Sequence, residues 1–214
     1  MKKNIKAVIF DVDGVLIDSE DLWYEIFKGL QRMYGQKTWR KDQFREHAGE
    51  FFSVFTKGQR QARAQEMEEE MGRYVLLNYF RFFEKIKIFP ETKTVLANLR
   101  LGGIKLALAT NTDHRLSLPT LRKFKLEKYF STMVFRKDVR HYKPAPDMPR
   151  LALRRLGVKR EEVIYVGDSI ADQGSAGSAG IFFVGLGIPG DRQIKRIGEV
   201  PGVIKELSKN SLRC

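Results

Sequence analysis

Short apolar runs alternate with helical stretches along most of this chain, and that alternation constrains the fold more than any other feature. The apolar runs predict strands at 6–10, 104–109, 133–135, 163–166 and 181–184. Helical stretches lie before or between the later runs, at 91–100, 116–124, 147–156 and 170–179. Strands that alternate with helices form a parallel sheet with right-handed crossovers. The sequence therefore predicts an α/β fold.

Residues 19–87 interrupt the alternation directly after the first strand. This segment contains no proline and no β-branched run. Apolar residues recur in it at helical spacing behind Ser19, which can cap a helix, and a second helical stretch runs from 59 to 85. We therefore predict a helical cap domain at 19–87, inserted into a discontinuous core domain at 1–18 and 88–214.

Composition excludes several classes of protein. Apolar residues make up 43 % of the 214 positions, which is enough to build a core and argues against wholesale disorder. A single cysteine, Cys214, and three histidines argue against a disulfide framework or a metal site built from these residues. No run approaches the roughly 18 apolar residues of a membrane span, and Asp11 interrupts the first apolar run too early for a signal peptide. We expect a cytoplasmic protein with no membrane partner, and the sequence predicts no oligomeric state.

The chain is strongly basic. Lys and Arg number 39 against 26 Asp and Glu, a formal balance of +13. A nucleic-acid partner, a preference for anionic small substrates and simple solubility would each account for that balance. Because the basic residues are spread along the chain and form no single block, we do not expect a nucleic-acid partner.

Polar residues follow three of the predicted strands or precede a predicted helix. They are Asp11, Asp13, Thr110, Asn111, Lys143, Asp168 and Asp172. Ligands of parallel α/β sheets bind beyond the carboxyl ends of the strands, so we expect these side chains to gather at one edge. Carboxylates, a hydroxyl and a lysine together suit Mg²⁺ and a phosphate.

The residue types match the steps of phosphoryl transfer. Asp11 and Asp168 can supply carboxylate ligands to Mg²⁺, with Asp172 one helical turn beyond. A carboxylate can also attack phosphorus, and a metal offsets the repulsion between two anions. Lys143 and Thr110 can hold phosphoryl oxygens.

Proton transfer has its own candidate, two residues after the first aspartate. Asp13 can protonate the leaving oxygen and later deprotonate water. Gly14, which we also count among the candidate phosphate-binding residues, lets the backbone turn sharply beside it.

Four segments of the chain resemble, in order, the four motifs of the haloacid dehalogenase (HAD) superfamily. They are Asp11-Val-Asp-Gly-Val-Leu-Ile-Asp-Ser19, the strand that ends in Thr110-Asn111, Lys143-Pro-Ala-Pro-Asp147, and Gly167-Asp-Ser-Ile-Ala-Asp172. The resemblance implies a three-layer, Rossmann-like core with the sheet in the middle layer. The insert resembles the small helical cap of the phosphoglycolate phosphatase and β-phosphoglucomutase branch.

The resemblance also implies a role for each motif residue. Asp11 would be the nucleophile and Asp13 the acid and base. Asp11, the main-chain carbonyl of Asp13 and Asp168 would hold Mg²⁺, assisted directly or indirectly by Asp172. The phosphate would be bound by Thr110, Asn111 and Lys143. His141 and Tyr142, which precede Lys143, depart from the small residues that relatives often carry there.

The function expected from these residues is hydrolysis of a small phosphomonoester, such as a sugar phosphate or a phosphoglycolate-like compound. Members named for dehalogenation lack an acid at the position of Asp13, which favours phosphoryl transfer. One alternative is a phosphomutase with the same core chemistry. Another is a basic nucleic-acid-binding protein that retains the fold, which its acidic motifs disfavour because they would repel a phosphodiester backbone.

Three further patterns each have a functional and a structural interpretation. The segment 185–190 matches the G-x-G-x-x-G of dinucleotide sites, but we interpret it as a turn, since too little chain follows for another βαβ unit. Aromatic residues at 51–55 and 79–83 could stack on bases, although packing within the cap is favoured. The basic residues of the insert, Arg45, His47 and Lys57, either meet a second charge on the substrate or lie at the surface.

Overall fold

The computed structural model describes residues 4–47 and 53–209, and the chain falls into two compact units. One unit comprises the chain up to Ile17 and from Ile88 onward. The other is Asp18–Lys87. The chain leaves and re-enters the first unit through two short paired strands, β2 (Ile17–Asp18) and β3 (Lys87–Ile88).

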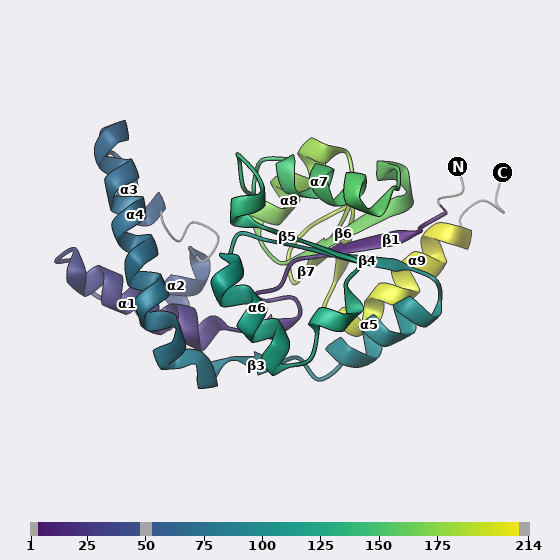
Figure 1. Ribbon diagram of the computed structural model, residues 1–214, viewed down its shortest axis with the longest axis horizontal. Coiled ribbons are helices and arrows are strands. Elements are labelled where there is room, and N and C mark those ends of the chain that lie inside the picture. The colour runs from purple at the N-terminus through teal and green to yellow at the C-terminus, as the bar shows by residue number, and fades with distance from the viewer. Residues whose placement is uncertain (1–3, 48–52, 210–214) are drawn as a thin grey trace. The chain divides into compact units, whose positions relative to one another are not determined.

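The first unit is built on a six-stranded sheet in the order β5-β4-β1-β6-β7-β8, and every strand pair is parallel (Figure 1). Its strands are β1 (Ala7–Phe10), β4 (Lys105–Thr110), β5 (Thr132–Phe135), β6 (Val163–Gly167), β7 (Phe182–Leu186) and β8 (Arg192–Ile194). The parallel sheet confirms the predicted α/β class. The short strand β8 was not predicted.

Helices cover both faces of this sheet. The helices α7 (Asp147–Leu156) and α8 (Ile170–Ala179) pack on one face (Figure 1). The opposite face carries α5 (Thr92–Leu101), α6 (His114–Lys123) and α9 (Val200–Lys209), of which α9 was not predicted. The three layers are those that the family resemblance implies.

The central strand β1 has no exposed residue, as expected for a strand that is covered on both faces. Its alternate side chains Ala7 and Ile9 join a core cluster that includes Met148 and Ala152 of α7. Phe10 lies in register with Leu108 of β4 and Val166 of β6. The residues that follow these three strands therefore emerge side by side at one sheet edge.

The second unit is helical. It contains α1 (Glu20–Met33), α2 (Lys41–Glu46), α3 (Ser53–Thr56), α4 (Gln61–Asn78) and the 3₁₀ segment η2 (Tyr79–Lys85). The single helix expected at 59–85 thus ends at Asn78. Tyr79 begins the tighter segment, where its buried ring meets Trp23 edge-on with centroids 5.7 Å apart.

Aromatic packing inside this unit centres on Phe27. Its ring lies 5.2 Å from the rings of Trp39, Phe44 and Phe55. This supports the packing interpretation for Phe55, whereas Phe80 is half-exposed. Two further phenylalanines of that pattern, Phe51 and Phe52, lie outside the described residues.

Across residues 4–47 and 53–209, no helix is long and apolar enough to cross a membrane. The 185–190 segment is a closed turn. A Cβ added at Gly185 would meet the carbonyl oxygen of Ile188 at 2.2 Å, so the loop packs against itself. That geometry supports the turn interpretation.

Candidate active site

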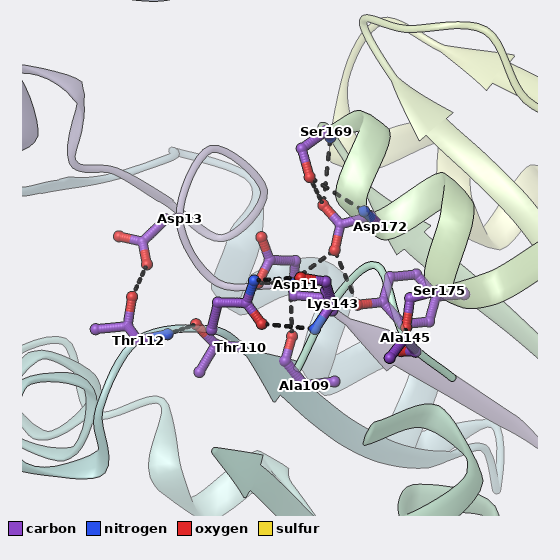
Figure 2. A network of polar contacts seen from close by, with 12 residues as sticks. Asp11, Asp13, Ala109, Thr110, Thr112, Lys143, Ala145, Ser169, Asp172 and Ser175 are labelled. Atoms are coloured by element: carbon purple, nitrogen blue, oxygen red, sulfur yellow. Dashed lines mark hydrogen bonds and ion pairs between the residues drawn. The ribbon is translucent and has the colours of Figure 1, made fainter. Parts of the chain in front are cut away.

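Lys143 lies at the centre of the polar residues at the carboxyl edge of the sheet (Figure 2). Its Nζ is 2.8 Å from Oδ1 of Asp11, and it donates hydrogen bonds to Oδ1 of Asp172 at 2.7 Å and to the carbonyl of Ala109 at 3.2 Å. The Lys143 side chain is only 3 % exposed. Burial lowers the pKa of Lys143, but Asp11 and Asp172 raise it further, so its pKa lies well above the ordinary value and the ammonium stays charged.

Asp172 is held by more donors than any other carboxylate described at the site. Its Oδ1 also accepts from the hydroxyl of Tyr165 at 2.9 Å, and its Oδ2 accepts from Oγ and N of Ser169 at 2.5 and 3.2 Å. The local sequence explains this geometry, because Ser169 caps α8 and Asp172 completes the capping box. Since both oxygens already accept two bonds each, an indirect role near a metal suits Asp172 better than direct ligation.

Three carboxylates come together where the sequence predicts a metal. Asp11, Asp168 and Asp172 each present an oxygen, and these atoms lie within 4.8 Å of one another. Burial and the charge of Asp172 raise the pKa of Asp168 to about 7, and the same two causes raise the pKa of Asp11 well above its ordinary value. One ammonium therefore does not balance the negative charge of this cluster. Oxygen ligands and surplus negative charge fit a hard divalent cation.

Gly14 makes room for this cluster. A Cβ at position 14 would lie 1.8 Å from Oδ2 of Asp168, and Gly14 has φ of +77°. Both the contact and the backbone conformation exclude a larger residue.

Asp13 lies apart from the three clustered carboxylates. Its Oδ2 accepts a hydrogen bond from Oγ1 of Thr112 at 3.0 Å (Figure 2). Thr110 is buried at the end of β4, and its Oγ1 accepts from the backbone N–H of Thr112 at 3.1 Å. The structure thus places Asp13 and Thr110 in one hydrogen-bonded chain that runs through Thr112.

Asn111 supports the backbone of Lys143. Its Nδ2 donates to the carbonyl of Lys143 at 3.1 Å, and its Oδ1 accepts from the N–H of Lys143 at 3.0 Å. Both polar atoms of the side chain are used in this way. Binding of phosphate by Asn111 stays a prediction.

The two residues that depart from the family pattern are anchored beside the same loop. His141 Nδ1 lies 3.2 Å from Oδ2 of Asp147. The guanidinium of Arg136 stacks over the ring of Tyr142 at 3.8 Å. Both contacts hold the segment that leads into Lys143.

Three residues that contribute to the site, Tyr165, Ser169 and Thr112, were not predicted from the sequence. Tyr165 lies in an apolar strand. Because a buried tyrosine hydroxyl needs a hydrogen-bond partner, the sequence could have predicted a polar contact for Tyr165. Ser169 and Asp172 form an S-x-x-D pattern that predicts a capping box. The contact of Thr112 could not be predicted from a local pattern, because its partner, Asp13, is distant in the sequence.

Comparison with known proteins agrees with the geometry. Residues 8–186 match the haloacid dehalogenase-like hydrolase family. A phosphorylated carbohydrates phosphatase from Thermotoga maritima is 36 % identical over 186 residues, which cover 83 % of this chain and 82 % of that protein. A phosphoglycolate phosphatase from Photorhabdus laumondii is 26 % identical over 189 residues, 86 % of this chain and 81 % of that one.

Solved structures show the same architecture. A HAD-superfamily hydrolase from Geobacter sulfurreducens superposes with a TM-score of 0.70 at 24 % identity, covering 93 % of this chain and 99 % of that one, which shows the fold alone. A "putative beta-phosphoglucomutase" from Thermotoga maritima has a TM-score of 0.67 at 32 % identity, covering 94 % and 99 %. The chain belongs to the haloacid dehalogenase-like hydrolase family.

Proposed function

We propose that this protein is a Mg²⁺-dependent phosphomonoester hydrolase that acts on a small phosphorylated metabolite through an aspartyl-phosphate at Asp11. The observation that carries the proposal is the placement of Lys143 Nζ 2.8 Å from Oδ1 of Asp11, inside a cluster that also holds Asp168. This arrangement supports the proposal, because a candidate nucleophile, a cation that suits a phosphate and candidate metal ligands lie close together. The names of two relatives, a phosphorylated carbohydrates phosphatase and a phosphoglycolate phosphatase, suggest the substrate class.

In the first step, a carboxylate oxygen of Asp11 forms a bond to phosphorus as the bond from phosphorus to the leaving oxygen breaks. Asp13 transfers its proton to that oxygen, so the product leaves as an alcohol. Lys143 and the hydroxyl of Thr110 stabilise the negative charge of the transferring phosphoryl group.

In the second step, Asp13 takes a proton from water, and the water oxygen attacks phosphorus. The bond between Asp11 and phosphorus breaks, inorganic phosphate leaves, and both aspartates return to their first states. Mg²⁺ held by Asp11, Asp168 and the main-chain carbonyl of Asp13 would offset the repulsion between the nucleophile and its anionic substrate.

A phosphomutase is the second candidate, favoured by the 32 % identity to the mutase-like structure from Thermotoga maritima. The two reactions share the first step and differ in what next accepts the phosphoryl group. Release of inorganic phosphate indicates a hydrolase, and interconversion of two sugar phosphate isomers indicates a mutase.

The test is a screen of phosphorylated metabolites for phosphate release, with the wild type and Asp11→Asn. We expect Mg²⁺-dependent release that a chelator abolishes, and a fall of at least about 10³-fold in Asp11→Asn. Glu161→Gln is the matched control, because Glu161 is an exposed carboxylate paired with Arg160, and its activity should equal that of the wild type. Equal activity of Asp11→Asn and the wild type would show that Asp11 is not the nucleophile.

A further inference from the structure

The carboxylate of Asp13 is held by the loop that follows β4. Thr112 Oγ1 donates to Asp13 Oδ2 at 3.0 Å, across 99 residues of sequence (Figure 2). Both residues are half-buried. The contact links the loop of the first motif to the loop of the second, and the family roles described above assign nothing to Thr112.

The position of Thr112 is itself well defined. Its backbone N–H donates to Oγ1 of Thr110 at 3.1 Å, and Thr110 is only 1 % exposed. Threonine is β-branched, so few side-chain rotamers are open to it. The hydroxyl that meets Asp13 is therefore fixed relative to the buried end of the sheet.

The backbone around Asp13 is also held. Gly14 N–H donates to the carbonyl of Ile17 at 2.8 Å, and Asp13 and Ile17 form an isolated β-bridge. With the main chain fixed, the aim of the Asp13 carboxyl depends on its own two side-chain torsions. A hydrogen bond from Thr112 restricts both of them.

We propose that Thr112 is a positioning residue for proton transfer, whose hydroxyl keeps the Asp13 carboxyl aimed at the leaving oxygen. The proposal rests on the proposed function, in which Asp13 is the general acid. A general acid must come within about 2.6–3.2 Å of the atom it protonates. A displacement of about 1 Å at a reacting group can lower the rate about 10²-fold.

Two variants separate the Thr112 hydroxyl from the rest of the side chain. Thr112→Val keeps the shape and the backbone N–H that reaches Thr110 but removes the hydroxyl, whereas Thr112→Ser keeps the hydroxyl. With an alkyl phosphate that the wild type hydrolyses, kcat of Thr112→Val should fall about 10- to 100-fold with KM within about twofold. Thr112→Ser should recover most of kcat, and an equal loss in both variants would overturn the proposal.

Two esters with different leaving groups distinguish a misplaced Asp13 carboxyl from a general loss of active-site structure. p-Nitrophenyl phosphate releases a stable phenolate that needs little help from an acid, whereas an alkyl phosphate releases an alkoxide that must be protonated. The first phosphoryl transfer is compared through kcat/KM, because hydrolysis of the aspartyl-phosphate is the same for both esters. Thr112→Val should lower kcat/KM for the alkyl ester much more than for p-nitrophenyl phosphate. The same loss of kcat/KM with both esters would indicate general damage to the site and would overturn the proposal.

A double-mutant cycle with Asp13→Asn keeps this proposal separate from the proposed function. If Thr112 acts through Asp13, Thr112→Val should lower kcat no further once Asp13→Asn is present. If Asp13→Asn lowers kcat but Thr112→Val does not, the positioning role alone is wrong. If Asp13→Asn leaves kcat for the alkyl ester unchanged, the acid role of Asp13 fails and the positioning role fails with it.

Discussion

Two lysines, one in each unit, lie between two carboxylates at nearly the same distances. The partners are Asp11 and Asp172 for Lys143, at 2.8 and 2.7 Å, and Glu20 and Asp21 for Lys41, at 2.8 and 2.5 Å. The surroundings differ, since the Lys143 side chain is 3 % exposed and the Lys41 side chain is 35 % exposed. The same contact therefore has a different physical meaning in each unit.

Burial decides what each cluster contributes. Water screens the exposed pairs of Lys41, and holding long side chains in place costs entropy, so such pairs add little stability. The charges around Lys143 have lost their hydration, and each is tolerated only because its partners are present. A buried cluster that opposes stability in this way is expected where its charges are needed for chemistry.

The largest expected effect is that of Lys143→Met. This change leaves Asp11 and Asp172 buried without their counter-charge, which should destabilise the protein by about 3–5 kcal/mol. It should also lower kcat/KM by about 10²–10³-fold, because the proposed electrostatic contact between the Lys143 ammonium and the phosphoryl group is lost. Denaturant unfolding and phosphate release measure the two effects. A loss of stability no larger than that of Lys41→Met would show that burial does not separate the two clusters.

Asp113 provides an intermediate case, with a side chain that is 16 % exposed. It caps α6 and accepts from N, Nε and Nη2 of Arg115 at 2.9, 3.0 and 2.9 Å. Burial raises the pKa of Asp113, but the side-chain and backbone bonds from Arg115 outweigh it and hold the pKa at about 2. The carboxylate is therefore favoured in the folded state.

Asp113→Asn keeps a cap acceptor but removes the charge, and at neutral pH it should cost about 1 kcal/mol. Because the folded pKa is depressed, the stability from Asp113 is complete above its unfolded pKa of about 4 and is lost as pH falls toward 2. The difference in unfolding free energy between the wild type and Asp113→Asn should therefore shrink below about pH 4. Urea unfolding at pH 6 and at pH 3 measures this difference. A difference that is constant or larger at pH 3 would contradict the depressed pKa of Asp113 in the folded state.

The parts of the molecule whose structure depends on nearby residues could be predicted from the sequence. The helices at 147–156 and 170–179 have the predicted bounds, because Gly157 and Gly180 end them in the left-handed conformation. The location of Lys143 among the acidic residues of the sheet edge could also be predicted, because a lysine directly before a helix at such an edge has few structural explanations.

Contacts between distant side chains could not be predicted in this way. Periodicity shows which face of a strand is buried, but it does not show that the Tyr165 hydroxyl meets Asp172 or that Thr112 meets Asp13. Those contacts depend on strand register and loop path. For Arg45, the sequence left open a substrate contact or a surface role. In the structure, its side chain is 59 % exposed and its Nε lies 2.8 Å from Oε2 of Glu20.

The smallest expected effect is that of Lys41→Met in the exposed cluster. The hydrogen bonds that Lys41 donates to the side chains of Asp21 and Glu20 raise the pKa of Lys41, so the ammonium is charged throughout the neutral range. Its loss should still cost less than about 1 kcal/mol, because Glu20 and Asp21 remain hydrated and Glu20 keeps its bond from Arg45. Raising the salt concentration from about 0.05 to 0.5 M should shrink even this difference, because exposed charges are screened. Urea unfolding at both salt concentrations measures this cost. A salt-independent cost above about 2 kcal/mol would mean that the exposed cluster contributes substantially to the stability of the fold.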